Sequence, residues 1–102
     1  MFGLVVRFTC KDEDGADAFD QLVAETVSKI KTEEPGTLVY AVHKVDGQPL
    51  QRMFYELYRD QAAFDAHEKQ PHTRRFLSAR EELLASTEVD RLDLQTGKGT
   101  NG

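Results

Sequence analysis

A turn at Asp46-Gly47 separates two alternating apolar segments, and this arrangement excludes most ways of folding the chain. Residues 37–45 and 52–58 are rich in β-branched and aromatic residues at a period of two, which is typical of strands. Because Asp-Gly is a strong turn signal, the loop 46–50 predicts an antiparallel hairpin. A flavodoxin-like parallel sheet is the alternative, but the hairpin and the small number of strands argue against it.

The rest of the chain supplies helices on both sides of the hairpin and a strand at each end. Apolar spacings of three and four residues predict a helix that follows a polar turn at 11–15 and ends near Thr32. Asp60 is a suitable N-cap for a helix over 61–70, and Pro71 is suited to start a second helical piece with an apolar stripe reaching Leu84. The predicted strands are 2–10, 37–45, 52–58 and 87–94.

This order of strand, helix, strand, strand, helix pair and strand predicts an α+β fold. A ferredoxin-like domain satisfies it with one antiparallel four-stranded sheet and helices on one face. At 102 residues the chain is expected to form a single domain. We assign residues 1–95 to that domain and residues 96–102, which are polar and rich in glycine, to a flexible C-terminal tail.

Both faces of the predicted sheet are apolar, although the helices can cover only one of them. Within residues 37–45, Tyr40 and Val42 alternate with Val39 and Ala41. An antiparallel sheet with one uncovered face normally keeps that face polar. A second copy packed face to face removes the apolar surface from water, so we expect a homodimer. The alternative is that these side chains line a ligand cavity or lie singly at the surface.

Charge and cysteine content restrict the partners and the environment of the protein. A net charge of −5 and a pI near 5.1, with Lys and Arg scattered along the chain, argue against nucleic acid as a partner. No apolar segment is long enough to span a membrane, and residues 1–10 read as a first strand rather than a signal peptide. Cys10 is the single cysteine, so no internal disulfide forms and a reducing, cytoplasmic location is expected.

Four short segments follow one another along the chain in a recognisable order. They are residues 34–40 (EPGTLVY), 54–60 (FYELYRD), 62–67 (AAFDAH) and 71–72 (PH). Together they resemble the successive signatures of the antibiotic biosynthesis monooxygenase family, and the resemblance extends over residues 2–94. It implies a dimeric α+β barrel, in which two ferredoxin-like sheets pack together.

The family that the chain resembles contains several activities. Some members oxygenate polyketide aromatics or quinols without metal or flavin, and some degrade haem. One relative isomerises a phosphorylated breakdown product of a quorum signal, and its strand, helix and histidine segment resembles residues 54–75. Haem-degrading members rely on a tryptophan, as some polyketide oxygenases do, whereas this chain has none. Its absence argues against haem degradation and against a direct copy of the polyketide chemistry.

A cofactor-free oxygenase needs a base, a donor for a developing oxyanion and an apolar pocket. His72, His67 and Glu56 are the candidate catalytic residues. His72 follows Pro71 at a predicted helix N-terminus, where the dipole favours a neutral imidazole, and His67 lies on the inward face of its predicted helix. Glu56, if buried among aromatic residues, needs a partner such as an imidazole or Arg7. Each also has a structural alternative: a hydrogen bond at a helix junction, packing on the sheet, or an ion pair.

Four other side chains are predicted to bind substrate: Tyr40, Tyr58, Arg75 and His43. A strand tyrosine can donate to a substrate oxygen, and Arg75 can bind a phosphate near a helix N-terminus. His43 shares a strand face with Val39 and Ala41, where an interface role is the alternative. The histidine spacing does not match a zinc site, so no metal is expected. The resemblance to oxygenases that work without metal or flavin implies that no cofactor is bound.

The leading hypothesis from the sequence is a homodimeric oxidoreductase, a cofactor-independent monooxygenase. Its substrates are expected to be oxygen and a small aromatic, quinol or enolisable molecule. An isomerase of a small phosphorylated diketone is the second hypothesis, motivated by Arg74-Arg75. A non-enzymatic ligand-binding dimer is the third. Fold-level analogy carries most of this functional prediction.

Overall fold

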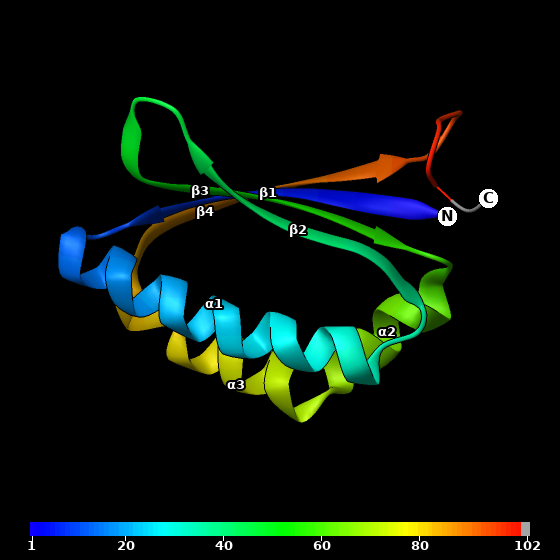
Figure 1. Ribbon diagram of the computed structural model, residues 1–102, viewed down its shortest axis with the longest axis horizontal. Helices are drawn as coiled ribbons and strands as arrows, with labels where there is room; N and C mark the ends of the chain where they lie inside the picture. Colours follow the sequence, from blue (N-terminus) through cyan, green and yellow to red (C-terminus); the bar gives the residue numbers. More distant parts are fainter. Residues whose placement is uncertain (101–102) are drawn as a thin grey trace.

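Four antiparallel strands form one sheet in the order β2-β3-β1-β4, and the helices lie against one of its faces (Figure 1). This computed structural model describes residues 1–100. It confirms the ferredoxin-like α+β class that the order of elements predicts. The elements in chain order are β1 (Phe2–Cys10), α1 (Glu13–Glu33), β2 (Thr37–Val45), β3 (Gln48–Tyr58), α2 (Gln61–Lys69), α3 (Pro71–Ala79), the 3-10 turn Glu81–Leu83 and β4 (Leu84–Asp93).

Two element starts lie earlier than the sequence predicts. The α1 helix begins inside the segment predicted as a polar turn, because the Asp12 carboxylate caps it by accepting a 2.7 Å hydrogen bond from the backbone N–H of Gly15. The β3 strand begins directly after the turn, which shortens the predicted loop. Gly47 has a φ of 75°, a left-handed conformation that glycine adopts without strain and that reverses the chain within two residues.

The C-terminal helix is shorter than predicted and the last strand is longer. The α3 helix ends at Ala79, so Leu84 belongs to β4 and not to a helical stripe. Leu84 pairs with Cys10, and the N–H of Lys11 donates a 3.0 Å hydrogen bond to the carbonyl of Leu83, which ties this segment to the end of β1. Residues 94–100 contain no helix or strand, and residues 101–102 of the predicted tail lie outside the described part of the chain.

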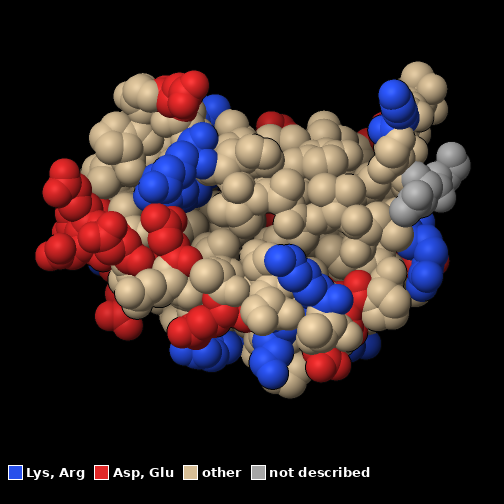
Figure 2. Space-filling view, in the orientation of Figure 1, with Lys and Arg blue, Asp and Glu red and all other residues tan. Residues whose placement is uncertain are grey.

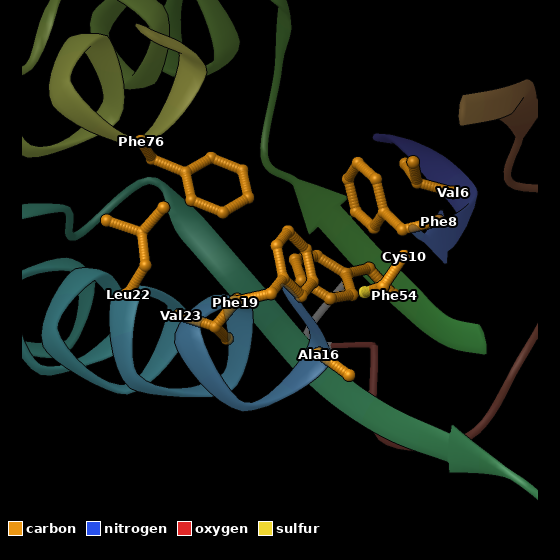
Figure 3. Close-up of a cluster of buried hydrophobic side chains, with 9 residues drawn as sticks. All are labelled: Val6, Phe8, Cys10, Ala16, Phe19, Leu22, Val23, Phe54 and Phe76. Atoms are coloured by element: carbon orange, nitrogen blue, oxygen red, sulfur yellow. The ribbon is translucent and has the colours of Figure 1, made fainter. Parts of the chain in front are cut away.

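The hydrophobic core lies between the sheet and the helices and is dominated by phenylalanine. Figure 3 shows side chains from α1, α3 and the central strands converging on this space. The Phe8 ring lies 4.7 Å from that of Phe54 and 5.1 Å from that of Phe19, in edge-on or tilted contact. The cluster consists of Val6, Phe8, Cys10, Ala16, Phe19, Leu22, Val23, Phe54 and Phe76. Burial raises the pKa of the Cys10 thiol, so the structure supports its prediction as a small packed side chain.

The opposite face of the sheet carries no helix (Figure 1). Strand alternation places Val39, Ala41, Met53, Tyr55 and Leu57 on this side, as predicted, with an irregularity in the pairing of β2 and β3 near Leu38. Acidic side chains gather at the end of the molecule where α1 begins (Figure 2). None of the helices within residues 1–100 is long and apolar enough to cross a membrane.

Candidate active site

A cavity of about 250 Å³ lies between the helix-facing side of the sheet and the helices α2 and α3. Most of its walls are apolar or aromatic, and a small set of polar side chains reaches into it from different elements. Such a combination is typical of small-molecule sites. The lining residues are Leu4, Val6, Phe8, Tyr40, Glu56, Phe64, His67, Glu68, Thr73, Phe76, Leu77, Arg80 and Val89.

The loop before β2 holds a buried carboxylate beside the cavity. Gly36 approaches α2 so closely that a Cβ built there lies 2.5 Å from the Cβ of Ala63. The carbonyl of Gly36 accepts a 3.0 Å hydrogen bond from the N–H of Arg59, and Asp60 caps α2 by accepting from Ala63 at 2.8 Å. These contacts fix α2 against the loop and bring Glu34 next to its inward face.

Glu34 is bonded to both helical histidines. Its Oε1 lies 2.6 Å from Nδ1 of His67, and its Oε2 is hydrogen-bonded to Nε2 of His72. Thr37 donates a further hydrogen bond of 2.7 Å to Oε1. Burial favours a higher pKa for the Glu34 carboxyl, but hydrogen bonds from His67, His72 and Thr37 outweigh it and hold that pKa below its ordinary value. Glu34 is therefore an ionised carboxylate at neutral pH, and both imidazole nitrogens that face it donate.

His67 connects this carboxylate to the cavity. Its side chain is 6% exposed and lines the cavity wall, with its ring centre 5.7 Å from that of Tyr40 and 5.3 Å from that of Tyr58. Because Nδ1 carries the hydrogen that Glu34 accepts, a neutral His67 has its lone pair on Nε2. Within residues 1–100 no hydrogen bond engages that nitrogen. A buried carboxylate that fixes a histidine tautomer leaves the other nitrogen available as a base.

Glu56 is a second buried carboxyl group, and it lines the cavity itself. It comes from the middle of β3 and accepts a 2.5 Å hydrogen bond from the hydroxyl of Tyr58. Removal from water raises the pKa of Glu56, and the Tyr58 hydrogen bond offsets only part of that rise. The proposed partner Arg7 was wrong, because alternation puts it on the opposite face of the sheet, where it donates to Gln51 at 2.5 Å.

Arg80, directly after α3, places a positive charge at the cavity. Its guanidinium carbon lies 5.3 Å from the ring centre of Phe8 and 5.4 Å from that of Phe76, within the range of cation–π attraction. In the described part of the chain, no carboxylate oxygen lies within 4.0 Å of a guanidinium nitrogen of Arg80. Burial lowers its pKa, although an arginine stays protonated at any physiological pH. Its charge is thus available to an anionic group in the cavity.

Only some of the predicted catalytic and substrate-binding side chains lie together in the structure. His67, Glu56 and Tyr40 line the cavity, and Tyr58 is buried behind Glu56. His72 lines a separate groove between α1 and α3 and reaches the site only through Glu34.

Two nominated residues lie away from the cavity. Arg75 is 67% exposed and forms a 2.8 Å ion pair with Glu25 at the outer groove. His43 is exposed on the uncovered sheet face, with Nδ1 3.1 Å from the carbonyl oxygen of Met53. Within residues 1–100 no group of three or more His, Cys, Asp or Glu side chains is arranged to hold a metal ion.

Glu34 and Arg80 are functional candidates that sequence reasoning missed. In the sequence, Glu34 stands out only as part of the segment 34–40, and Arg80 falls inside the predicted helical piece that reaches Leu84. A carboxylate immediately before Pro-Gly, at the end of an amphipathic helix, is a signal that could have identified Glu34. Nothing in the sequence near Arg80 indicates that α3 ends there and that its side chain covers two phenylalanine rings.

Comparisons with known proteins agree with this architecture. The sequence model of the family described as antibiotic biosynthesis monooxygenase matches residues 1–79. No curated protein sequence matches the chain. A candidate antibiotic biosynthesis monooxygenase from Caulobacter crescentus CB15 has a similar structure, with a TM-score of 0.86, 22% identity, and coverage of 93% of this chain and 90% of that one.

Two further solved structures are similar over nearly their full length. A Pseudomonas aeruginosa protein aligns with a TM-score of 0.83 and 25% identity, covering 93% of this chain and 94% of that one. A Mycobacterium tuberculosis protein aligns with a TM-score of 0.85 and 22% identity, covering 94% and 96%. At such identities the structural matches establish the fold, and the site must carry the argument for chemistry.

Proposed function

The chain belongs to the antibiotic biosynthesis monooxygenase family, and on that premise we propose that it is a cofactor-independent monooxygenase of a small aromatic, quinol or enolisable substrate. The observation that carries the proposal is the apolar cavity into which the Glu34-oriented imidazole of His67 opens. A volume of about 250 Å³ lies just below the roughly 300–1,000 Å³ of drug-sized sites, which favours a small ring system over a polycyclic one.

In the proposed reaction, Nε2 of His67 removes the proton of a phenol or enol. Glu34 stabilises the resulting imidazolium, as a buried carboxylate does in other histidine bases. The electron-rich anion reduces oxygen directly, and its carbon forms a bond to one oxygen atom. His67 returns the proton, which gives a hydroperoxide on that carbon. Where the carbon still carries a hydrogen, the hydroperoxide loses water and leaves a carbonyl group.

Three other side chains support the anion in this scheme. The Arg80 guanidinium supplies a positive charge in a low-dielectric site, where it is stronger than in water. Burial raises the pKa of Tyr40 well above its ordinary value, so its hydroxyl stays protonated and can donate to a substrate oxygen. The raised pKa of Glu56 favours its neutral form, which does not repel a substrate anion.

Oxygen uptake by the purified protein in the presence of chelator, against a panel of quinols and anthrone-like phenols, tests the proposal. We expect uptake with a small member of the panel and a loss of about 10²–10⁴-fold in kcat/KM for His67→Ala, the usual contribution of a general base. Lys69→Ala, at the exposed end of α2, is the control and should keep full activity. An absence of uptake across the panel would contradict the proposal and favour the isomerase or the binding protein.

We also propose that the functional protein is a homodimer that packs the uncovered faces of two sheets together. The apolar side chains on this face support it, because an uncovered face is normally polar. Leu92, at the end of β4 on the same side, is 40% exposed. Sedimentation should give a dimer that Tyr55→Lys converts to monomer, whereas Ser78→Lys on the outer face of α3 leaves it unchanged. A monomeric wild type would exclude this arrangement.

A further inference from the structure

His67 and His72 share one buried carboxylate but open to different sides of the helical layer. His67 lines the cavity under the sheet, whereas His72 lines an open groove of about 720 Å³ between α1 and α3. Their side chains are 6% and 10% exposed, and the Glu34 side chain between them is 3% exposed. Within residues 1–100, Glu34 is the only carboxylate within 4.0 Å of either ring.

We propose that Glu34 couples the two imidazoles, so that His67 gains a proton in the cavity as His72 releases one into the outer groove. The inference rests on the proposed function, in which His67 is the base. It makes Glu34 and His72 positioning residues that act through His67. Proton release to the groove then keeps the charge of the buried cluster constant during each turnover.

The charge balance of the cluster is the physical reason for this coupling. One carboxylate neutralises one positive charge, and a second buried cation without a partner carries a large desolvation penalty. In this scheme the single positive charge of the cluster lies on His72 before proton transfer and on His67 after it. When Nε2 of His67 accepts the substrate proton, His72 releases its Nδ1 proton to water in the groove. The Nε2–H of His72 donates to Glu34 both before and after the exchange, so that hydrogen bond is kept.

Within residues 1–100, the Glu34 side chain has three hydrogen-bond partners, His67, His72 and Thr37, and of these only the imidazoles are titratable side chains. On the cavity side, Arg80 and Glu68 face His67, together with Tyr40, Glu56 and Tyr58. On the groove side, His72 shares the lining with Glu25, Lys29, Glu33 and Arg75. Of these, Glu25 and Arg75 form an ion pair. Thr37, the third donor to Glu34, is not titratable in this range.

An NMR titration of the histidine rings tests the coupling without requiring activity. In the wild type we expect the ring signals of His67 and His72 to change with pH in two linked steps. In His72→Gln the amide can still donate to Glu34 but cannot ionise, so the signals of His67 should follow a single step in place of the linked ones. Independent single-step curves for both rings in the wild type would overturn the proposal, even if the variant failed to fold.

The kinetic readout then separates this inference from the proposed function. With an active substrate, the acidic limb of the pH profile of kcat/KM should move to higher pH in His72→Gln, because His67 is protonated more readily. An unchanged limb in an active variant would overturn the coupling while leaving the monooxygenase proposal intact. If no substrate is oxygenated but the linked NMR titration is present, the function fails and the coupling stands.

Discussion

The hydroxyl of Tyr58 donates a 2.5 Å hydrogen bond to Oε1 of Glu56, two positions earlier on the same face of β3. Both side chains are buried, with Tyr58 fully enclosed and Glu56 at the cavity wall. A short hydrogen bond from a hydroxyl to a carboxylate is a strong one. It is the only hydrogen bond that the Glu56 side chain makes within residues 1–100, so the protonation state of Glu56 depends on Tyr58.

Tyr58→Phe should therefore raise the pKa of Glu56 further. The hydroxyl stabilises the ionised carboxylate, and its removal leaves burial to favour the neutral acid. A ¹³C titration of the Glu56 carboxyl should show its midpoint at higher pH than in the wild type. Tyr55→Phe, on the opposite face of β3, is the control and should leave that midpoint unchanged. An unshifted midpoint in Tyr58→Phe would show that the hydrogen bond does not control Glu56.

Glu56→Gln should make the protein more stable at neutral pH. The pKa of Glu56 is raised in the folded state above its ordinary value of 4.5. Such a group contributes stability that is fully present below the unfolded pKa and is lost as the pH rises through the folded pKa. At pH 7 the free energy of unfolding, measured with urea, should be higher than that of the wild type by more than about 0.5 kcal/mol, the usual scatter for surface substitutions. This difference should vanish near pH 4, and Glu88→Gln on exposed β4 should show neither effect.

Glu34→Gln should behave in the opposite way. The pKa of Glu34 is lowered in the folded protein, so its contribution to stability is present above its ordinary pKa of 4.5 and is lost as the pH falls through the folded value. The variant should be less stable than the wild type at pH 7, and the difference should shrink in acid. Urea unfolding at both pH values provides the measurement. A deficit that is equal at pH 7 and pH 3 would assign the loss to packing instead of charge.

The fold was predictable because its information is local. The period-two alternation of Phe2, Val6 and Phe8 places them on the helix-facing side, and Asp60 and Pro71 mark the helix starts where the structure has them. The boundaries that failed depend on contacts between distant segments. Leu84 leaves the helix because it pairs with Cys10, across most of the chain, and nothing beside it in sequence encodes that pairing.

The site was predictable only where one element determines it. The spacing of His67 from Ala63 predicts a shared inward face, and both are buried. The carboxylate that orients His67 lies 33 positions away, so its role depends on how the loop before β2 packs on α2. Arg75 looked like a phosphate ligand in the sequence, but the α3 register places it next to Glu25 on the outer surface.

Gly36→Ala should destabilise the protein by about 1–3 kcal/mol, the usual effect of overpacking. The added Cβ meets that of Ala63 at 2.5 Å, a distance that carbon atoms do not tolerate. Ala63→Gly removes the obstacle and by itself weakens the α2 helix by about 1 kcal/mol. The double variant should lose clearly less stability than the sum of the two single losses, as measured by chemical denaturation. Additive losses would show that the contact does not limit this position.

Arg52→Lys should cost about 2 kcal/mol, although it keeps the charge. Arg52 is 4% exposed and links α1 to β3, because Nε and Nη2 donate to the two Asp20 oxygens at 2.8 and 3.0 Å. Its Nη1 also donates to the carbonyls of Pro49 and Gln51. A lysine ammonium cannot reproduce this planar fork, so several of these acceptors lose their donors.

The ion pair of Arg75 with Glu25 provides the matched control for that prediction. It has the same 2.8 Å separation as the Arg52–Asp20 pair, but both of its side chains are more than half exposed. Exposed pairs contribute roughly 0–1 kcal/mol and weaken with salt. Arg75→Lys should therefore change the free energy of unfolding by less than about 0.5 kcal/mol, within the range of ordinary surface substitutions. Equal losses for the two arginine variants would show that separation, not burial and hydrogen-bond geometry, sets the strength of these pairs.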